Sequence, residues 1–259
     1  PEHVFDTIEW HERYILRNED NKLILGRGLM GDVIIDIDKT SHILIGGNTG
    51  SGKSVLVQCL LWQAIHQADV VYVADFKGGV DFSYVWQEFA YIITEEKKLL
   101  VLLNHLADIL EERKRLFKEV DAANITEYRE KSGDYMQRIV FACDEVAELL
   151  DKTGADKSRK ELLAQIEARL ALIARQGRAF GIHLILATQR PDANILPGQI
   201  KNNMNIRICG RADTTLSTII IGDGRAAEQI PHDAQGRFIM EDGTVFQAYY
   251  FSDDTISKW

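Results

Sequence analysis

Cysteine, proline and long apolar runs are scarce in this sequence. Its 259 residues include three cysteines and four prolines, and no apolar run approaches the roughly 18 residues that indicate a membrane-spanning helix. Cys59, Cys143 and Cys209 lack metal-ligand spacing, so we expect them to be small core residues in a reducing compartment. The polar, acidic N-terminus is not typical of a signal peptide, and we expect a cytoplasmic location.

Excess positive charge is also missing. The formal net charge is −9, which argues against a generally basic nucleic-acid-binding surface. A local basic patch is compatible with this charge, particularly one assembled by oligomerisation. The chain is 46% hydrophobic and 27% charged, as is typical of a globular protein with a sizeable core. It begins at Pro1 rather than Met, and we expect it to be a fragment of a longer protein.

A glycine-rich segment between an expected strand and an expected helix is the strongest signal. The apolar run His42–Ile45 is typical of a buried strand, and apolar residues recur with helical spacing from Val55 onward. The segment between them fits the phosphate-loop pattern G-x-x-x-x-G-K-[ST] in its required context. The residues that this pattern places around a nucleotide are Gly47, Asn48, Thr49, Gly50, Ser51, Gly52, Lys53, Ser54 and Val55.

The chemistry of such a loop requires these residue types. Glycines let the backbone wrap a phosphate and direct successive N–H groups inward. The first turn of the following helix adds unpaired N–H donors and the positive end of the helix dipole. We expect Lys53 to contact the β- and γ-phosphates of ATP and Ser54 to offer its hydroxyl to Mg²⁺. The alternative is a glycine-rich turn that only precedes a helix.

Two adjacent acids follow the expected strand Arg138–Cys143. A buried parallel strand delivers its last residues to the crevice beside the phosphate loop. There Asp144 could hold Mg²⁺, commonly through a coordinated water, and Glu145 could polarise the attacking water. An acid pair in this place is also a common helix N-cap, and a helical stretch follows it.

Two more polar residues are candidates for catalysis. Gln189 follows the apolar run Leu184–Ala187 and could sense the γ-phosphate, or it could belong to an ordinary turn. Arg178 lies at the end of the preceding expected helix, where an arginine is usually a partner of the helix dipole or a surface charge. In the more specific hypothesis, Arg178 is an arginine finger that reaches into the active site of a neighbouring subunit.

Strands and helices alternate along the chain, which indicates an α/β fold with a mostly parallel sheet covered by helices on both faces. We interpret residues 1–259 as a single domain, in which residues 1–35 could form an appendage and Lys22–Ile37 a hairpin. The other main expected strands and helices are Val70–Phe76, Phe89–Thr94, Glu95–Val120, Arg138–Cys143, Ser158–Phe180, Ile182–Ala187, Asn205–Cys209, Phe238–Met240 and Val245–Phe251.

Several segments resemble the FtsK/SpoIIIE family of DNA-pumping motors. The most specific of them is Gly177–Pro191, whereas the phosphate loop is shared by many ATPases. The other matching segments are Asn48–Ser54, Val73–Lys77, Gly198–Asn203, Asn205–Ile208, Ala226–Gln229 and Gly236–Ile239. The resemblance implies a RecA-like P-loop NTPase core that forms a hexameric ring, hydrolyses ATP with Mg²⁺ and moves double-stranded DNA through its centre.

The resemblance also implies roles for single residues. By family pattern, Lys53 and Ser54 bind the triphosphate and Mg²⁺, and Asp144 and Glu145 form the second acidic motif. Gln189 corresponds to the family's sensor.

In the same family pattern, Arg178 corresponds to the arginine that acts in trans. The turns Asp75–Gly79 and Gly198–Asn203 are candidates for the pore. Lys77 and Lys201 would then contact DNA phosphates, although both could equally be loop lysines in water.

The chain departs from the septal members of the family, which commonly have Asp-Pro-Lys where it has Asp75-Phe76-Lys77. The departure favours the conjugation-type branch over chromosome partitioning, with a membrane-anchored remainder that would place this domain at the cytoplasmic face. The alternatives are a motor of a type VII-like protein secretion system and, from another class, a nucleotide-binding docking module. The retained Lys53, Asp144 and Glu145 argue against the docking module.

Overall fold

The structure, a computed structural model, describes residues 7–15, 21–40, 42–78, 80–190 and 196–258. Pro191, at the end of the family-like segment Gly177–Pro191, and residues 1–6 lie outside the described residues.

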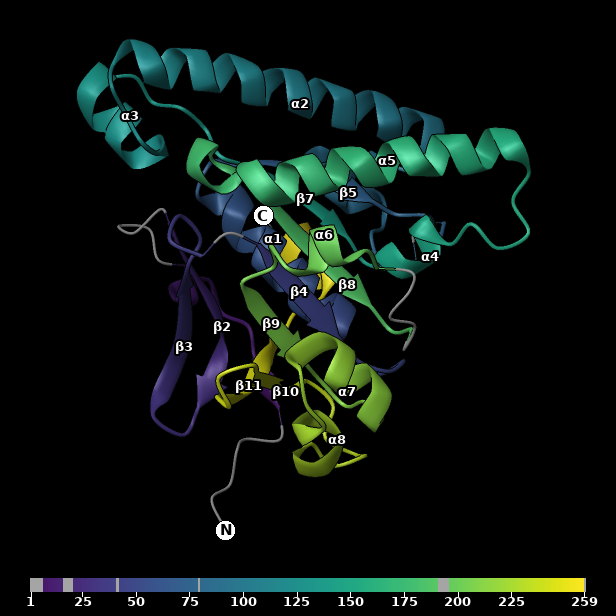
Figure 1. The fold of residues 1–259 in the computed structure, drawn as a ribbon. Coiled ribbons are helices and arrows are strands. Elements are labelled where there is room, and N and C mark those ends of the chain that lie inside the picture. The colour runs from purple at the N-terminus through teal and green to yellow at the C-terminus, as the bar shows by residue number, and fades with distance from the viewer. Residues whose placement is uncertain (1–6, 16–20, 41, 79, 191–195, 259) are drawn as a thin grey trace.

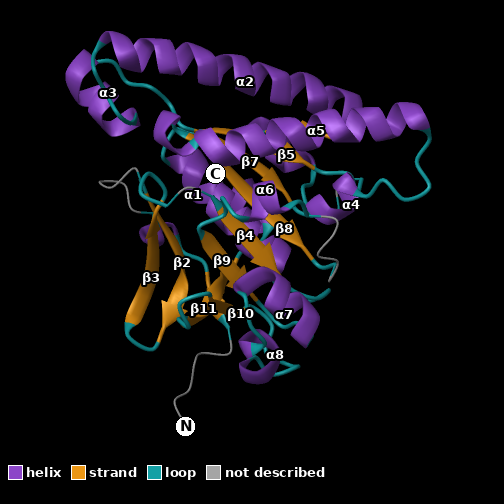
Figure 2. Cartoon of the chain, viewed as in Figure 1, coloured by secondary structure: helices purple, strands orange, loops and turns teal. Residues whose placement is uncertain are grey.

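One large sheet runs through the protein (Figures 1 and 2). Its strands are β1 (Ile8–Glu9), β2 (Lys22–Gly28), β3 (Gly31–Asp36), β4 (Ile43–Gly46), β5 (Val70–Ala74), β6 (Tyr91–Ile93), β7 (Ile139–Cys143), β8 (Ile182–Thr188), β9 (Ile206–Cys209), β10 (Arg237–Met240) and β11 (Val245–Tyr250). They lie in the order β3-β2-β11-β10-β9-β4-β8-β7-β5-β6, and β1 pairs with β11. The part from β9 to β6 is parallel, and β10, β11, β2 and β3 extend it with antiparallel pairs.

Helices cover both faces of this sheet. They are α1 (Lys53–His66), α2 (Glu96–Glu119), α3 (Ile125–Ser132), α4 (Val146–Leu150), α5 (Lys157–Gln176), α6 (Gly198–Lys201), α7 (Thr214–Ile221), α8 (Arg225–Gln229) and α9 (Asp253–Ser257). Helix α1 shares one hydrophobic core with the sheet, and α2, α5 and α7 share a second core with the opposite face. The α/β fold predicted from the sequence is therefore confirmed. Within the described part of the chain, no helix is both long and apolar enough to cross a membrane.

The two cores explain why the central strands are apolar without alternation. In β4, Ile43 and Ile45 belong to the core under α1, whereas Leu44 belongs to the core on the other face. Successive side chains of a strand point to opposite faces, so a strand covered on both faces must be apolar at every position. Cys59 and Cys143 lie in these cores as buried free thiols, as the sequence analysis expected.

The hairpin expected near the N-terminus is present and continues the central sheet. Its strands β2 and β3 pair antiparallel, and β2 also pairs with β11. The Gln63 side chain of α1 binds the backbone of the hairpin. It accepts a hydrogen bond from the Ile24 N–H at 2.8 Å and donates one to the Ile24 carbonyl at 2.9 Å.

The helix expected over Ser158–Phe180 ends earlier than its apolar pattern indicates. Helix α5 stops at Gln176, and a short 3₁₀ turn follows over Arg178–Phe180. A Cβ at Gly177 would lie 2.5 Å from the Ile182 carbonyl oxygen, so the end of α5 packs against the start of β8 too closely for any side chain at residue 177. Gly181 then ends the turn with a φ of 68°, a left-handed conformation that favours glycine.

A buried ion pair joins the hairpin to the parallel sheet. Arg138, only 1% exposed, donates to the two carboxylate oxygens of Asp38 through Nε and Nη2, each at 2.6 Å. Burial opposes the ionisation of Asp38, but the hydrogen bonds and charge of Arg138 outweigh it and lower the pKa of the carboxyl below its usual value.

Replacing Arg138 with methionine should destabilise the protein strongly, because the Asp38 carboxylate would stay buried without its main partner. We expect Arg138→Met to lower the free energy of unfolding by about 3–5 kcal/mol at neutral pH. The contribution of a carboxyl with a lowered pKa is complete above its unfolded pKa and disappears as pH falls through the folded one. The difference between wild type and variant should therefore shrink in acid, as measured by urea unfolding at a series of pH values.

The matched control is Arg115→Met, which removes an exposed pair with Glu119 on α2. Exposed pairs contribute about 0–1 kcal/mol, so this variant should remain close to wild type. Equal losses in the two variants would contradict the assigned role of Arg138.

Candidate active site

The glycine-rich loop lies at the carboxyl edge of the parallel sheet, directly after β4 (Figure 1). Its first residues sit between the two neighbouring strands: the Gly47 N–H donates to the carbonyl of Thr188, the last residue of β8, at 3.3 Å, and the Asn48 N–H to the Arg211 carbonyl after β9 at 2.7 Å. The carboxyl ends of parallel strands meet at this edge, where open α/β sheets bind their ligands.

Helix α1 begins at Lys53, so the loop leads straight into the start of a helix. Gly52 precedes it with a φ of 94°, and a Cβ there would lie 3.0 Å from the backbone of Gly236. Glycine is therefore required both by the backbone conformation and by the close approach of the segment before β10. The helix start offers N–H donors without intrahelical partners and the positive end of the dipole, the arrangement that binds phosphate.

The Asp144 side chain contacts this helix start. Lys53 Nζ lies 2.9 Å from Asp144 Oδ1, and both side chains are buried. The Ser54 hydroxyl donates to Asp144 Oδ2 at 2.9 Å. Burial alone would raise the pKa of Asp144, but Lys53 and Lys77 hold it well below the usual range. The carboxylate is thus kept ionised beside a hydroxyl and two ammonium groups.

Mg²⁺ fits this donor set. A hydroxyl and a carboxylate are the oxygen donors that it prefers, and it commonly retains waters and binds substrate phosphates instead of a complete protein cage. Over the ranges that the structure describes, no cluster of three or more His, Cys, Asp or Glu is placed to hold a metal by itself. Ser54 and Asp144 are therefore the residues that would hold the ion together with a triphosphate.

Glu145 points away from Asp144 and towards β8. Its carboxylate accepts a hydrogen bond from the Thr188 hydroxyl at 2.7 Å and one from the Gln189 N–H at 3.1 Å. Although Glu145 occupies the N-cap position of α4, its side chain makes no capping hydrogen bond. Burial raises the pKa of its carboxyl, and the hydrogen bond from Thr188 opposes the rise only in part. This geometry favours an acid–base role over the capping alternative.

Gln189 connects this carboxylate to the glycine-rich loop. Its Oε1 accepts a hydrogen bond from the Thr49 hydroxyl at 2.7 Å, while its backbone N–H reaches Glu145. The structure therefore brings Gln189 to the loop, the position that a γ-phosphate sensor needs.

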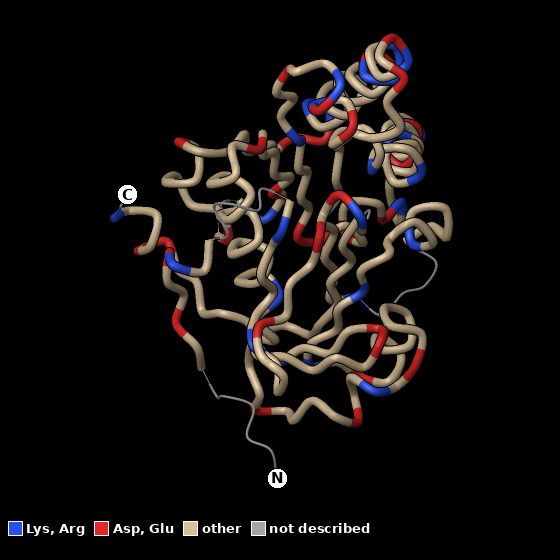
Figure 3. The backbone as a smooth tube through the Cα atoms, turned by 90° about the vertical axis from the view of Figure 1, so that its left-hand side faces the viewer, with Lys and Arg blue, Asp and Glu red and all other residues tan. Residues whose placement is uncertain are grey.

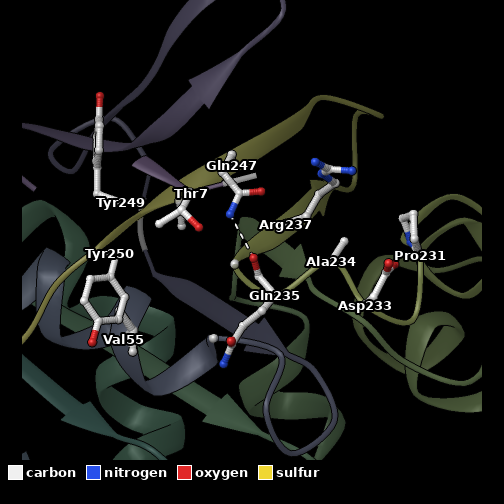
Figure 4. Close-up of a pocket in the computed structure, with 13 residues that line it drawn as sticks. Thr7, Val55, Pro231, Asp233, Ala234, Gln235, Arg237, Gln247, Tyr249 and Tyr250 are labelled. Atoms are coloured by element: carbon white, nitrogen blue, oxygen red, sulfur yellow. Dashed lines mark hydrogen bonds between the residues drawn. The ribbon is translucent and has the colours of Figure 1, made fainter. Parts of the chain in front are cut away.

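Two hollows adjoin the loop. The smaller, of about 240 Å³, is lined by loop residues and by Lys77, Asp81, Gln189 and Gln235. The larger, of about 570 Å³, also reaches Gly52 and Val55 (Figure 4). Its walls come from residues 231–237 and from β11, and a hydrogen bond of 2.8 Å from Gln247 to the Gln235 carbonyl joins them.

Lys77 lies in the smaller hollow, whereas the sequence analysis placed it at a pore. Its Nζ is 2.6 Å from Asp144 Oδ2 and 3.1 Å from Asp81 Oδ2. Burial opposes the charge of Lys77, but the two carboxylates outweigh it and raise the pKa of the ammonium above its usual value. The contact of Lys77 with DNA stays a prediction. The observed partners of its ammonium are Asp144 and Asp81, in the nucleotide site.

Arg178 and Lys201 lie away from the glycine-rich loop. Arg178 precedes β8 and Lys201 precedes β9, so both belong to the amino edge of the parallel strands. Strand β8 has seven residues and spans roughly 20 Å. Arg178 is exposed and donates to the Lys39 carbonyl at 3.2 Å. The structure thus separates Arg178 from the loop of its own chain.

The charge distribution shows no division into a basic and an acidic half. Figure 3 shows basic and acidic positions interspersed along the described chain, in keeping with the net charge of −9. A DNA-contacting surface would therefore have to be local, as the sequence analysis expected.

Sequence reasoning assigned no role to three residues of the site: Thr188, Asp81 and Arg211. Arg211 donates to the Thr49 carbonyl at 2.7 Å and so holds the glycine-rich loop from β9. Thr188 ends one strand of the parallel sheet and Arg211 follows another, and that position alone could have marked them as candidates. Asp81 lies seven residues after β5 ends, and no motif marks it.

Comparison with known proteins identifies the relatives of this chain. The model of the FtsK/SpoIIIE family matches residues 7–193. A DNA translocase FtsK from Campylobacter jejuni is 31% identical over 221 residues, which cover 80% of this chain and 22% of that protein. A DNA translocase FtsK from Oceanobacillus iheyensis is 30% identical over 263 residues, which cover 93% of this chain and 32% of that protein. The chain thus spans a minor part of the length of these curated relatives.

Solved structures show the same fold. The pCW3 conjugation coupling protein TcpA, in a monomer form with ATPγS, superposes with a TM-score of 0.93 at 39% identity, covering 99% of this chain and 74% of that one. The cytoplasmic domain of the type VII secretion ATPase EccC from Thermomonospora curvata gives a TM-score of 0.71 at 25% identity, covering 97% of this chain and 31% of that one.

The hydrogen bond from Thr188 should tune the acidity of Glu145. A hydrogen bond to a charged group contributes about 1.5–3 kcal/mol, and a shift of one pKa unit corresponds to about 1.4 kcal/mol. Removing it in Thr188→Val destabilises the carboxylate, so the acid limb of the pH profile for ATP hydrolysis should move up by about one pH unit. Thr218→Val, an exposed threonine on α7, is the control and should leave the profile unchanged. An unshifted profile in Thr188→Val would remove Thr188 from the site.

Proposed function

The chain belongs to the FtsK/SpoIIIE family, and we propose that it is the ATP-hydrolysing motor domain of a double-stranded DNA translocase. The observation that carries this proposal is the meeting of the glycine-rich loop with the two acids after β7. Lys53 and Ser54 both contact Asp144, and Gln189 contacts both Thr49 and Glu145. Groups that would bind, activate and sense a triphosphate therefore line one edge of the sheet.

Each group has a role that its position supports. Lys53 neutralises the β- and γ-phosphates, and the N–H groups at the start of α1 bind their oxygens. Mg²⁺, when bound, neutralises charge that develops on the phosphates, and Ser54 and Asp144 hold it. Glu145 orients and polarises the attacking water, while Gln189 reports the γ-phosphate to the loop that follows β8.

The larger hollow suits the nucleoside. It adjoins the loop at Gly52 and Val55. Val55 and Tyr250 supply apolar surface, and Gln235 and Gln247 supply amide groups (Figure 4). Such a mixture of apolar walls and a few polar groups is typical of small-molecule sites.

Arg178 supports an assembly of several copies. An arginine at the amino edge of the sheet lies apart from its own glycine-rich loop, but it could reach the loop of an adjacent copy. A homo-oligomeric ring, for which the family pattern implies six subunits, would complete each site with the neighbour's arginine. Lys201, at the same edge, is the remaining candidate for contact with DNA phosphates.

The resemblance to known structures favours conjugative transfer of DNA over the alternatives. TcpA, described as a conjugation coupling protein, matches nearly the whole chain at 39% identity, against 25% for the type VII secretion ATPase. In conjugation the domain would act at the cytoplasmic face of the membrane, attached to a membrane-anchored remainder of its full-length protein. Protein secretion remains the second candidate, supported by the EccC fold.

ATP hydrolysis by an assembled form should rise with double-stranded DNA. We expect the stimulation to fall steeply with salt, because binding to phosphates releases counterions. Glu145→Gln should still bind ATP but turn over about 100-fold more slowly or worse. Lys201→Ala should weaken the stimulation, whereas Lys157→Ala, which removes a 92% exposed lysine, should not. An assembled ATPase indifferent to DNA would contradict the proposal, and stimulation by a secretion substrate instead would favour the second candidate.

If Arg178 acts in trans, two inactive variants should complement each other. Equal amounts of Arg178→Ala and Glu145→Gln subunits in mixed rings would leave about a quarter of the sites with both an intact glutamate and an intact neighbouring arginine, and hydrolysis should recover in proportion. Arg175→Ala, an exposed arginine one helical turn earlier, should be active by itself. Absence of recovery in rings shown to be mixed would contradict the trans role.

A further inference from the structure

The Lys77 ammonium lies where a metal ion would approach Asp144. Asp144 Oδ2, the oxygen that accepts from the Ser54 hydroxyl at 2.9 Å, is also 2.6 Å from Lys77 Nζ. Lys53 takes the other oxygen, Oδ1, at 2.9 Å. Protein donors therefore surround both oxygens of this carboxylate.

The stretch around Lys77 is anchored at Asp75 and at Asp81, and Val80 between them is exposed. At its start, the Lys77 N–H donates to Asp75 Oδ1 at 2.9 Å. At its end, the Gln58 side chain of α1 donates to the Asp81 carbonyl. Between these points Val80 is 81% exposed, and Gly78 has a φ of 78° with no atom within 4 Å of where a Cβ would lie. Open space therefore adjoins Gly78, next to Lys77, and the Val80 side chain is accessible to solvent.

We propose that Lys77 is a cationic latch, whose pairing with Asp144 and Asp81 keeps its ammonium at the active site until Mg²⁺ with a nucleotide displaces it. This inference rests on the proposed nucleotide site. It gives Lys77 the role of transmitting the binding of Mg²⁺ and nucleotide to the exposed surface around Val80, in place of a direct contact with DNA.

Electrostatics gives the reason for displacement. A monovalent ammonium and a divalent ion a few ångströms apart repel each other strongly in a partly buried site. Mg²⁺ prefers oxygen donors such as carboxylates, and an ammonium 2.6 Å from Asp144 Oδ2 would obstruct its approach to this oxygen. The competition lowers the apparent affinity for Mg²⁺ by the fraction of molecules in which the latch is open.

The movement can be followed at Val80. The native cysteines are all buried, with exposures of 0% for Cys59, 1% for Cys143 and 0% for Cys209. A fluorophore on Val80→Cys would therefore be selective. Its anisotropy is measured with Mg²⁺ alone, with ATPγS and EDTA, and with ATPγS and increasing Mg²⁺, while binding of ATPγS is measured separately by calorimetry.

In the labelled protein we expect the anisotropy to fall only when Mg²⁺ and ATPγS are both present. Adding Lys77→Gln removes the latch, so the anisotropy should be low from the start. In calorimetry, half-maximal Mg²⁺-dependent binding of ATPγS should then need about tenfold less Mg²⁺. Lys77→Arg retains the charge and should behave like wild type. Lys98→Gln removes the lysine of an exposed pair with Glu95 and should also leave both readouts unchanged.

The outcomes separate this inference from the function beneath it. Tight ATPγS binding with an unresponsive label, or equal Mg²⁺ requirements in wild type and Lys77→Gln, would overturn the latch alone. Absence of ATPγS binding in every condition would overturn the nucleotide site and the latch with it. If Lys77→Gln unfolds, the titrations of wild type and Lys77→Arg still test the latch. A label whose anisotropy does not respond to Mg²⁺ and ATPγS in either protein rejects it.

Discussion

The contact between Lys53 and the Asp144 carboxylate is the constraint on which the candidate active site depends. It joins the start of α1 to the end of β7, although β7 is not a neighbour of β4 in the sheet. β8 lies between them, so all three strands must end in register at the same edge. In the observed register Gly46 pairs with Thr188 and Cys143 with Leu186, so the three strands end within two residues of one another.

Two adjacent carboxylates acquire different properties from their surroundings. Asp144 faces two ammonium groups that keep its pKa low, whereas Glu145 is buried among neutral donors and its pKa is raised. A pair of acids whose environments separate their pKa values is the pattern by which one site divides ion binding from acid–base work. The division follows from the turn after β7, which directs Asp144 to Lys53, Ser54 and Lys77 and directs Glu145 to Thr188 and Gln189.

Much of this arrangement could be predicted from the sequence. The loop before Lys53 and the acids at Asp144 carry their spacing and context with them, and central strands reveal themselves by apolar runs. The early end of α5 could not be predicted, because it depends on the contact between Gly177 and the Ile182 carbonyl. The position of the Lys77 ammonium depends on its contact with Asp144, which is distant in sequence. The resemblance of Val73–Lys77 to the family did not reveal this contact.

A parallel sheet gives the two edges of the protein unlike chemistry. The carboxyl edge holds the glycine-rich loop and the acids, and the amino edge presents Arg178, whose side chain donates to the Lys39 carbonyl. If one edge completes the other, the contact joins two different surfaces and is heterologous, so it repeats from copy to copy until the rotation closes. A site divided between edges therefore supports a ring over a two-fold dimer, since a two-fold axis would pair each surface with itself. In the proposed ring, the separation along β8 would be the structural feature that links the chemistry of one chain to the assembly of several.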